Sequence, residues 1–78
     1  MVHLMKFKVD DKIVAIHYDS QITFLLGYTG TIIDYKPKKN DYWVRWDVYP
    51  AHSYIYDCAY IENNYVLYDS PEGIWARL

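Results

Sequence analysis

One cysteine, three histidines and ten carboxylates are the side chains of this 78-residue chain that could do chemistry. Cys58 with His52 or His17 and an aspartate could form a nucleophilic set, because a thiolate needs a neighbouring base to activate it. The histidine spacing matches no metal-ligand motif, and Cys58 lacks the companion thiolate of a structural zinc site. Cys58 precedes an apolar strand, which favours a small buried thiol. The sequence therefore predicts no catalytic residue, no metal site, no cofactor and no enzyme.

Three lysines, Lys36, Lys38 and Lys39, lie close together in a polar segment that spans residues 36–41. They could contact nucleic-acid phosphates, although a lysine-rich turn also keeps a strand edge from aggregating. The rings that could stack on bases beside them are Tyr35, Tyr42 and Trp43. Nucleic-acid binding is therefore the alternative function, and it predicts an affinity that falls steeply as salt rises.

The element that must position these side chains is a β-hairpin over residues 27–47. Residues 29–35 are β-branched and aromatic, Pro37 cannot donate within a central strand, and residues 42–48 resume the strand pattern. Strict alternation assigns a core face to Tyr42, Val44, Trp46 and Val48. The opposite face then presents Trp43, Arg45, Asp47 and Tyr49. Its aromatic and arginine residues are of the kind that anchors protein interfaces.

Further strands are predicted at residues 13–18, 53–56 and 65–68. In the strand at residues 29–35, either one face is mixed or a bulge at Ile33–Asp34 turns both Ile32 and Tyr35 inward. A polar turn is expected at Asp10–Asp11, and residues 57–61 are expected to form a single 3₁₀ turn. The loop at residues 19–26 is apolar at its end, and residues 69–78 form a tail able to dock on the domain or on a partner.

Size and composition indicate one small domain over residues 1–78, with residues 1–6 as its N-terminal end. Ten Tyr, three Trp and two Phe supply the core, because each ring can bury roughly 150 to 250 Å². A net charge of −2 argues against nonspecific duplex binding as the main activity. The single cysteine and the lack of a signal or membrane-spanning run favour a reducing, cytoplasmic setting without membrane contact.

The chain resembles the Src-homology-3-like small barrels. Asp-Lys-Ile-Val at residues 11–14, Gly-Tyr-Thr-Gly-Thr-Ile at residues 27–32 and Trp-Val-Arg-Trp-Asp at residues 43–47 are similar to the Mib/Herc-type domain and to KOW and Tudor-like modules. The resemblance implies an all-β, five-stranded barrel with a 3₁₀ turn before the last strand. It also implies a binding function, because members of these groups bind peptides, modified side chains or RNA and are rarely enzymes.

The expected function is non-enzymatic binding to a larger protein, as a modulator or inhibitor. In composition the chain resembles many small phage-encoded accessory proteins, which often act by occupying a surface of a host enzyme. The expected contact residues are Trp43, Arg45, Tyr49, Phe24, Leu25 and Trp75. Oligomeric state stays open between monomer and homodimer, since a homodimer needs only one self-complementary patch.

Overall fold

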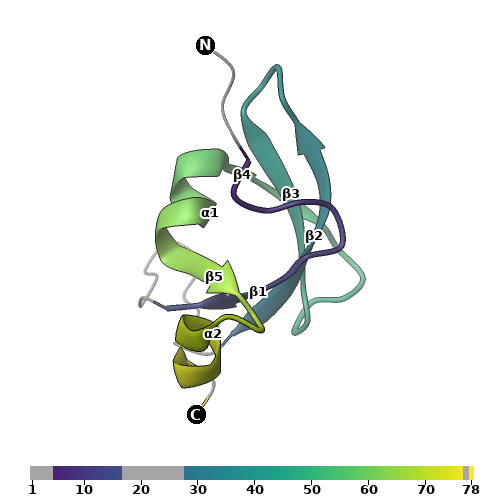
Figure 1. Cartoon of the computed structure of the whole chain (residues 1–78). Coiled ribbons are helices and arrows are strands. Elements are labelled where there is room, and N and C mark those ends of the chain that lie inside the picture. Colours follow the sequence, from purple (N-terminus) through teal and green to yellow (C-terminus); the bar gives the residue numbers. More distant parts are fainter. Residues whose placement is uncertain (1–4, 17–27, 77) are drawn as a thin grey trace.

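The computed structural model describes residues 5–16, 28–76 and 78. Its strands form one antiparallel sheet in the order β4-β3-β2-β1-β5, with two short helices (Figure 1). The elements in chain order are β1 (Lys12–Ala15), β2 (Thr29–Lys36), β3 (Asp41–Trp46), β4 (Tyr54–Asp57), α1 (Cys58–Asn64), β5 (Tyr65–Leu67) and α2 (Pro71–Ala76). The all-β sheet is confirmed, and the helices are additions to it.

The sheet is open rather than closed into a barrel, which corrects the expected architecture. β4 and β5 form its two edges and are not paired with each other. The chain between these edges folds as α1, which contacts β3, β4 and β5. Helix α1 therefore lies between the two edge strands, which in a closed barrel would be hydrogen-bonded to each other.

Helix α1 also replaces the expected 3₁₀ turn. Asp57 caps it, because its Oδ2 accepts a hydrogen bond from the Ala59 N–H at 3.0 Å. The helix has seven residues and extends through Asn64, three residues beyond the predicted turn at residues 57–61. Its length follows from packing, since Cys58 and Ile61 are both fully buried in the core.

The core is aromatic, and its largest fully buried side chains are Trp46, Tyr42, Tyr65 and Phe7. The Trp46 ring lies 5.2 Å from that of Tyr65, and its Nε1 donates to the Tyr56 hydroxyl at 2.9 Å. Burial of the indole therefore leaves its N–H with a partner, as a buried polar group requires.

The predicted core face of β3 is confirmed within the strand. Tyr42, Val44 and Trp46 are fully buried, whereas Val48 lies beyond the end of β3 and is exposed. The predicted polar turn is also present, because the Asp11 N–H donates to the Lys8 carbonyl at 3.0 Å.

The predicted bulge in β2 is confirmed by a register shift between Ile32 and Asp34. Ile32 is fully buried, and Tyr35 packs against the core with its ring 5.7 Å from that of Tyr42. The extra residue therefore lets both side chains face the core, which strict alternation would forbid.

The two helices cover different faces of the sheet. Ile13 and Ala15 belong to the core under α1, whereas Val14 alternates with them and is buried on the opposite face. Helix α2 packs against β1 and β5, on the other side of β1 from α1 (Figure 1). Within the described residues, no helix has the length and apolar character needed to cross a membrane.

Two buried side chains that lose a proton only at alkaline pH, Tyr42 and Cys58, predict how stability depends on pH. Burial, followed by the hydrogen bond to Glu62, raises the pKa of Tyr42 above its usual 10.0. Burial, followed by the charge of Glu62, raises the pKa of Cys58 from 9.0 to about 11. Because both folded-state pKa values lie above the unfolded values, the stabilisation is complete below pH 9 and is lost as pH rises through the folded values.

We therefore expect the free energy of unfolding to fall above pH 9, as measured by urea titrations over the alkaline range. Tyr42→Phe removes one of the two groups, so its stability should fall less steeply with pH, from a lower starting value. Parallel pH profiles for wild type and Tyr42→Phe would contradict this assignment.

Candidate protein-binding surface

Trp43 and Arg45 lie on the outer face of β3, where the alternation placed them. Trp43 is half-buried, because its cross-strand neighbours are Asp34 on β2 and Ile55 on β4. The Lys36 Nζ lies 5.6 Å from the centroid of its ring, a cation–π contact. Trp43, Arg45 and Ile55, which we call the strand face, therefore combine one shielded ring with two exposed side chains.

The other expected contact residues lie elsewhere. Tyr49 is 52% exposed in the turn after β3, where its N–H donates to the Trp46 carbonyl at 3.0 Å. Phe24 and Leu25 lie outside the described residues. Trp75 lies on α2, which packs on β1 and β5 and not on β3. The described members of the expected set are thus divided between the β3 region and α2.

Local capping positions α2. The Ser70 Oγ accepts from the Gly73 N–H at 3.0 Å and donates to the Leu67 carbonyl at 2.7 Å. Pro71 opens the helix at the position where its missing N–H costs nothing, and Glu72 adds a negative charge to the first turn. Ser-Pro-Glu at residues 70–72 is typical of a helix N-terminus. The predicted tail at residues 69–78 did not include this helix.

Gly73 allows α2 to approach β5 closely. A Cβ at this position would overlap the Leu67 carbonyl oxygen and lie 2.7 Å from that of Tyr68. The helix backbone therefore rests directly on the end of β5, and this contact fixes which side of α2 faces outward.

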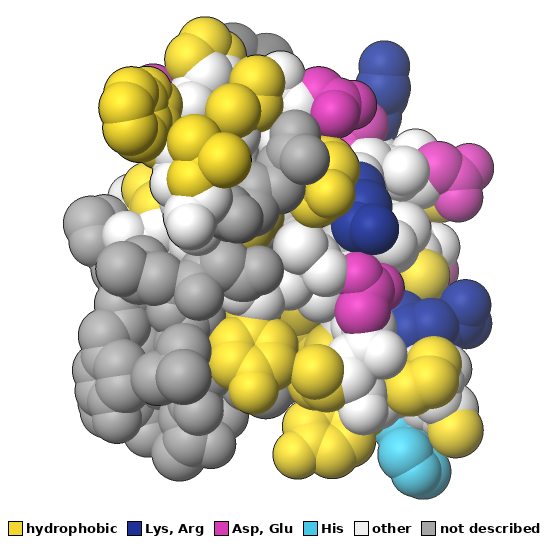
Figure 2. Space-filling view, turned by 90° about the horizontal axis from the view of Figure 1, so that it is seen from below, with side chains coloured by type: hydrophobic (Ala, Val, Ile, Leu, Met, Phe, Trp, Pro, Cys, Tyr) yellow, Lys and Arg dark blue, Asp and Glu magenta, His cyan; other side chains and the backbone are white. Residues whose placement is uncertain are grey.

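The outward side of α2 is strongly apolar. Ile74 is 45% exposed, Trp75 is 77% exposed and Leu78 is 90% exposed. We call these three residues the α2 patch. Hydrophobic side chains gather over α2 at the upper left of Figure 2, while acidic and basic side chains follow one another along its right-hand side.

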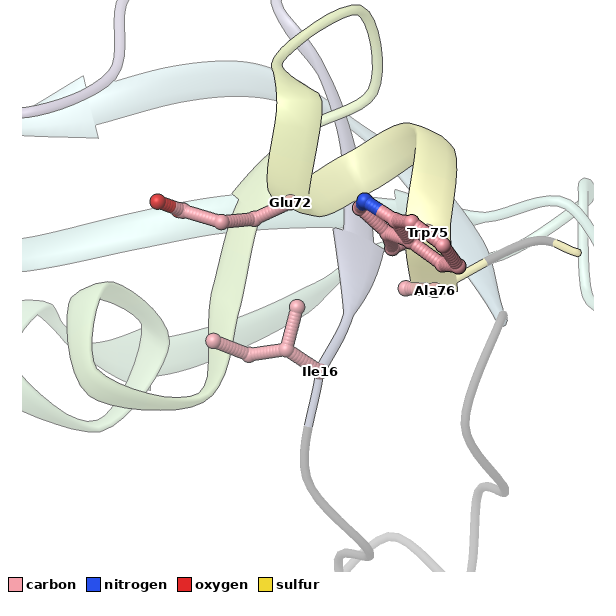
Figure 3. A pocket seen from close by; sticks show the side chains of 4 residues that line it. All are labelled: Ile16, Glu72, Trp75 and Ala76. Atoms are coloured by element: carbon pink, nitrogen blue, oxygen red, sulfur yellow. The ribbon is translucent and has the colours of Figure 1, made fainter.

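A shallow hollow of about 340 Å³ adjoins the α2 patch. It is lined by Ile16, Glu72, Trp75 and Ala76, with Ile16 reaching from the end of β1 toward the helix (Figure 3). The Glu72 carboxylate points away from Trp75 in the same view. The hollow is thus an apolar surface with an acidic rim.

The exposure of Trp75 sets the energy available for binding. An aromatic side chain can bury roughly 150 to 250 Å², and Trp75 still exposes 77% of its surface. At about 25 cal/mol per Å², covering that exposed part is worth roughly 3 to 5 kcal/mol. Trp43 offers less, because the fold already covers part of its ring. Trp75 is therefore the stronger of the two candidate anchors.

The lysine-rich hairpin tip is only partly available to a ligand. Lys38 and Lys39 are exposed, but Lys36 forms an ion pair with Asp34 at 2.9 Å. Its hydrogen bond, followed by that of the Tyr35 N–H, lowers the pKa of Asp34. Two of the three rings expected to stack on bases face the core: Tyr42 is fully buried, and Tyr35 packs against it.

The surroundings of Cys58 do not favour its use as a nucleophile. Cys58 is fully buried, as predicted, and burial raises the pKa of its thiol to about 11. His52 is exposed, and His17 lies outside the described residues. The described part of the chain holds no group of three His, Cys, Asp or Glu side chains able to bind a metal ion.

Comparison with protein-family models, with curated proteins and with solved structures found no match to this chain. Functional inference therefore depends on the geometry of the α2 patch, the strand face and the hairpin tip.

We expect Gly73→Ala to destabilise the protein by about 1 to 3 kcal/mol, because the added methyl group must push α2 away from β5. Amide hydrogen exchange should accelerate in α2 more than in β3. Glu72→Ala is the matched control, since this side chain is exposed on the same helix. Urea titrations and hydrogen exchange would measure both effects, and equal stability of the two variants would contradict the close approach.

Proposed function

We propose that this protein is a non-enzymatic protein-binding domain that occupies a surface of a larger protein through its α2 patch. The observation that carries the proposal is the 77% exposure of Trp75 beside the exposed Ile74 and Leu78. Tryptophan is enriched among the residues that dominate interface energies, and a cluster of exposed large apolar side chains is typical of such a site.

The shape of the patch favours a protein over a small molecule. Small-molecule sites are concave and bury most of their ligand, whereas Trp75 stands out from a short helix beside a shallow hollow. A ring that projects in this way suits insertion into a pocket of a partner. Modulation or inhibition would follow from covering that partner's surface, the mode of action expected from the sequence.

The strand face is a second contact region in this proposal. Ile55 is 52% exposed beside Trp43, and Arg45 is exposed on the same face of β3. Its smaller free aromatic area makes it secondary to the α2 patch.

The same proposal places the fold with the Src-homology-3-like small barrels. Support comes from the strand order β5-β1-β2-β3-β4 and from the short helix directly before the last strand. In this interpretation α1 takes the place of the 3₁₀ turn and separates the edges that other members bring together.

Nucleic-acid binding is kept as the alternative because Lys38 and Lys39 are exposed at the hairpin tip. Acidic groups surround that tip, since Asp34 pairs with Lys36 and Asp41 lies opposite Lys36 in the β2–β3 register. The local charge is thus less positive than the lysines alone suggest, and the protein-binding proposal has the stronger support.

The test is purification of the tagged full chain from its host cells after nuclease treatment, at low and high salt. We expect one protein to co-purify in stoichiometric amount under both conditions. Trp75→Ala should weaken its affinity by about 100-fold or more, because the anchor is worth roughly 3 kcal/mol. Trp43→Ala is the matched control, and it should weaken binding less.

A Lys38→Ala, Lys39→Ala double variant separates the two functions. Loss of binding in this variant, together with sensitivity to nuclease and salt, would replace the protein-binding proposal with the nucleic-acid alternative. Partner binding unchanged in Trp75→Ala would remove the α2 patch as the contact.

A further inference from the structure

Strand β4 has one hydrogen-bonded side and one open side. The Cys58 N–H donates to the Asn40 carbonyl at 3.0 Å, and the same ladder pairs Tyr56 with Tyr42. Hydrogen-bonded and non-hydrogen-bonded pairs alternate in an antiparallel ladder, so every second residue of β4 turns its backbone groups toward β3. The N–H and C=O groups of Ile55, between these positions, therefore point away from the sheet.

This open edge lacks several of the devices by which proteins usually block edge pairing. β4 contains no proline, no lysine and no register shift against β3. Its side chains are accessible, with Ile55 52% exposed and Tyr54 41% exposed. The opposite edge, β5, has only three residues, and short length is itself a protection.

The sequence of the edge is self-complementary. Residues 53–57 read Ser-Tyr-Ile-Tyr-Asp, in which Tyr-Ile-Tyr is the same in both directions. We propose that two copies of the chain pair antiparallel through β4, with the two-fold axis at Ile55. The two sheets then continue as one, and the interface is isologous.

The register about Ile55 satisfies both the backbone and the side chains. Ile55 faces Ile55 of the second copy and exchanges two backbone hydrogen bonds with it, because its N–H and C=O are the groups that point outward. Tyr54 faces Tyr56 of the second copy on one side of the joined sheet. On the other side, the two isoleucines lie between the two Trp43 rings, so the row across the interface is apolar.

Charge excludes the neighbouring register. An axis at Asp57 would place two carboxylates directly opposite each other, which is destabilising in a cross-strand pair. With the axis at Ile55, Asp57 instead faces Ser53 of the second copy, whose hydroxyl can donate to a carboxylate. An axis at Tyr56 is compatible with the backbone, but it pairs Ile55 with Asp57 of the second copy and so sets a carboxylate against the apolar row.

This dimer goes beyond the proposed function: it covers Ile55 of the strand face, the secondary contact region, and leaves the α2 patch free on each copy. Four residues per strand make a small contact, so we expect a weak dimer that forms as concentration rises. It would present two α2 patches on one assembly, and a partner with two sites could then bind with avidity.

Sedimentation equilibrium of the purified full chain, without any partner, tests the pairing. We expect the average mass to rise from 9.4 kDa toward twice that value as protein concentration increases. Ile55→Lys places two like charges at the axis and should hold the mass at 9.4 kDa. Ile74→Lys, an equally exposed isoleucine on α2, is the matched control and should dimerise like wild type.

A mass of 9.4 kDa at all concentrations of wild type, or equal association of the two lysine variants, would overturn the proposal. Far-ultraviolet circular dichroism and urea titrations of Ile55→Lys separate loss of pairing from loss of fold. If that variant unfolds, Ile55→Thr, which keeps β-branching and reduces apolar area, replaces it and should weaken association by about 10-fold.

The register has its own test. Only the residue on the axis meets its own copy, so Ile55→Cys should form a disulfide-linked dimer under mild oxidation faster than Ile74→Cys. Cys58 does not compete, because it is fully buried and its pKa is raised to about 11. Equal crosslinking rates for the two variants would contradict an axis at Ile55. Failure here leaves the α2 patch untouched, since partner capture is measured separately.

Discussion

The hydrogen bond between Tyr42 and Glu62 holds together three parts of the chain that are far apart in sequence. The Tyr42 hydroxyl donates to Glu62 Oε2 at 2.6 Å and accepts from the Phe7 N–H at 3.1 Å. The same Oε2 accepts from the Lys6 N–H at 3.2 Å. β3, α1 and the N-terminal segment thus meet at one carboxylate, and losing a partner would leave a polar group unsatisfied at a cost of about 1 to 3 kcal/mol.

This constraint explains why the sheet stays open. Helix α1 follows β4 without a linking residue and leads directly into β5, so its position decides how far apart the two edges lie. Glu62 ties the middle of α1 to Tyr42, and Ile61 is fully buried against the core. The helix cannot leave this site without breaking both contacts. The two edge strands, β4 and β5, therefore stay unpaired with each other.

The sequence predicted what depends on a period of two and missed what depends on short local signals. Five strands, the bulge at Ile33–Asp34 and the buried face of β3 followed from alternation and β-branched residues. Helices of six and seven residues are too short to show a 3.6-residue period. Only capping residues indicate these two helices, and the prediction of a tail at residues 69–78 did not use Ser70 before Pro71. The partial burial of Trp43 depends on its neighbours on β2 and β4. Alternation within one strand does not predict which residues of other strands lie beside it.

The three tryptophans differ in how far the fold covers their side chains. Trp46 is fully buried and bonded to Tyr56, so its loss would unfold the core. Trp43 is half-buried, and the Lys36 Nζ lies over its ring, so the fold already covers part of its surface. Trp75 contributes least to the fold, because most of its surface is in water. The apolar area of that ring is free to stabilise a complex, which is why the α2 patch rather than the strand face carries the functional proposal.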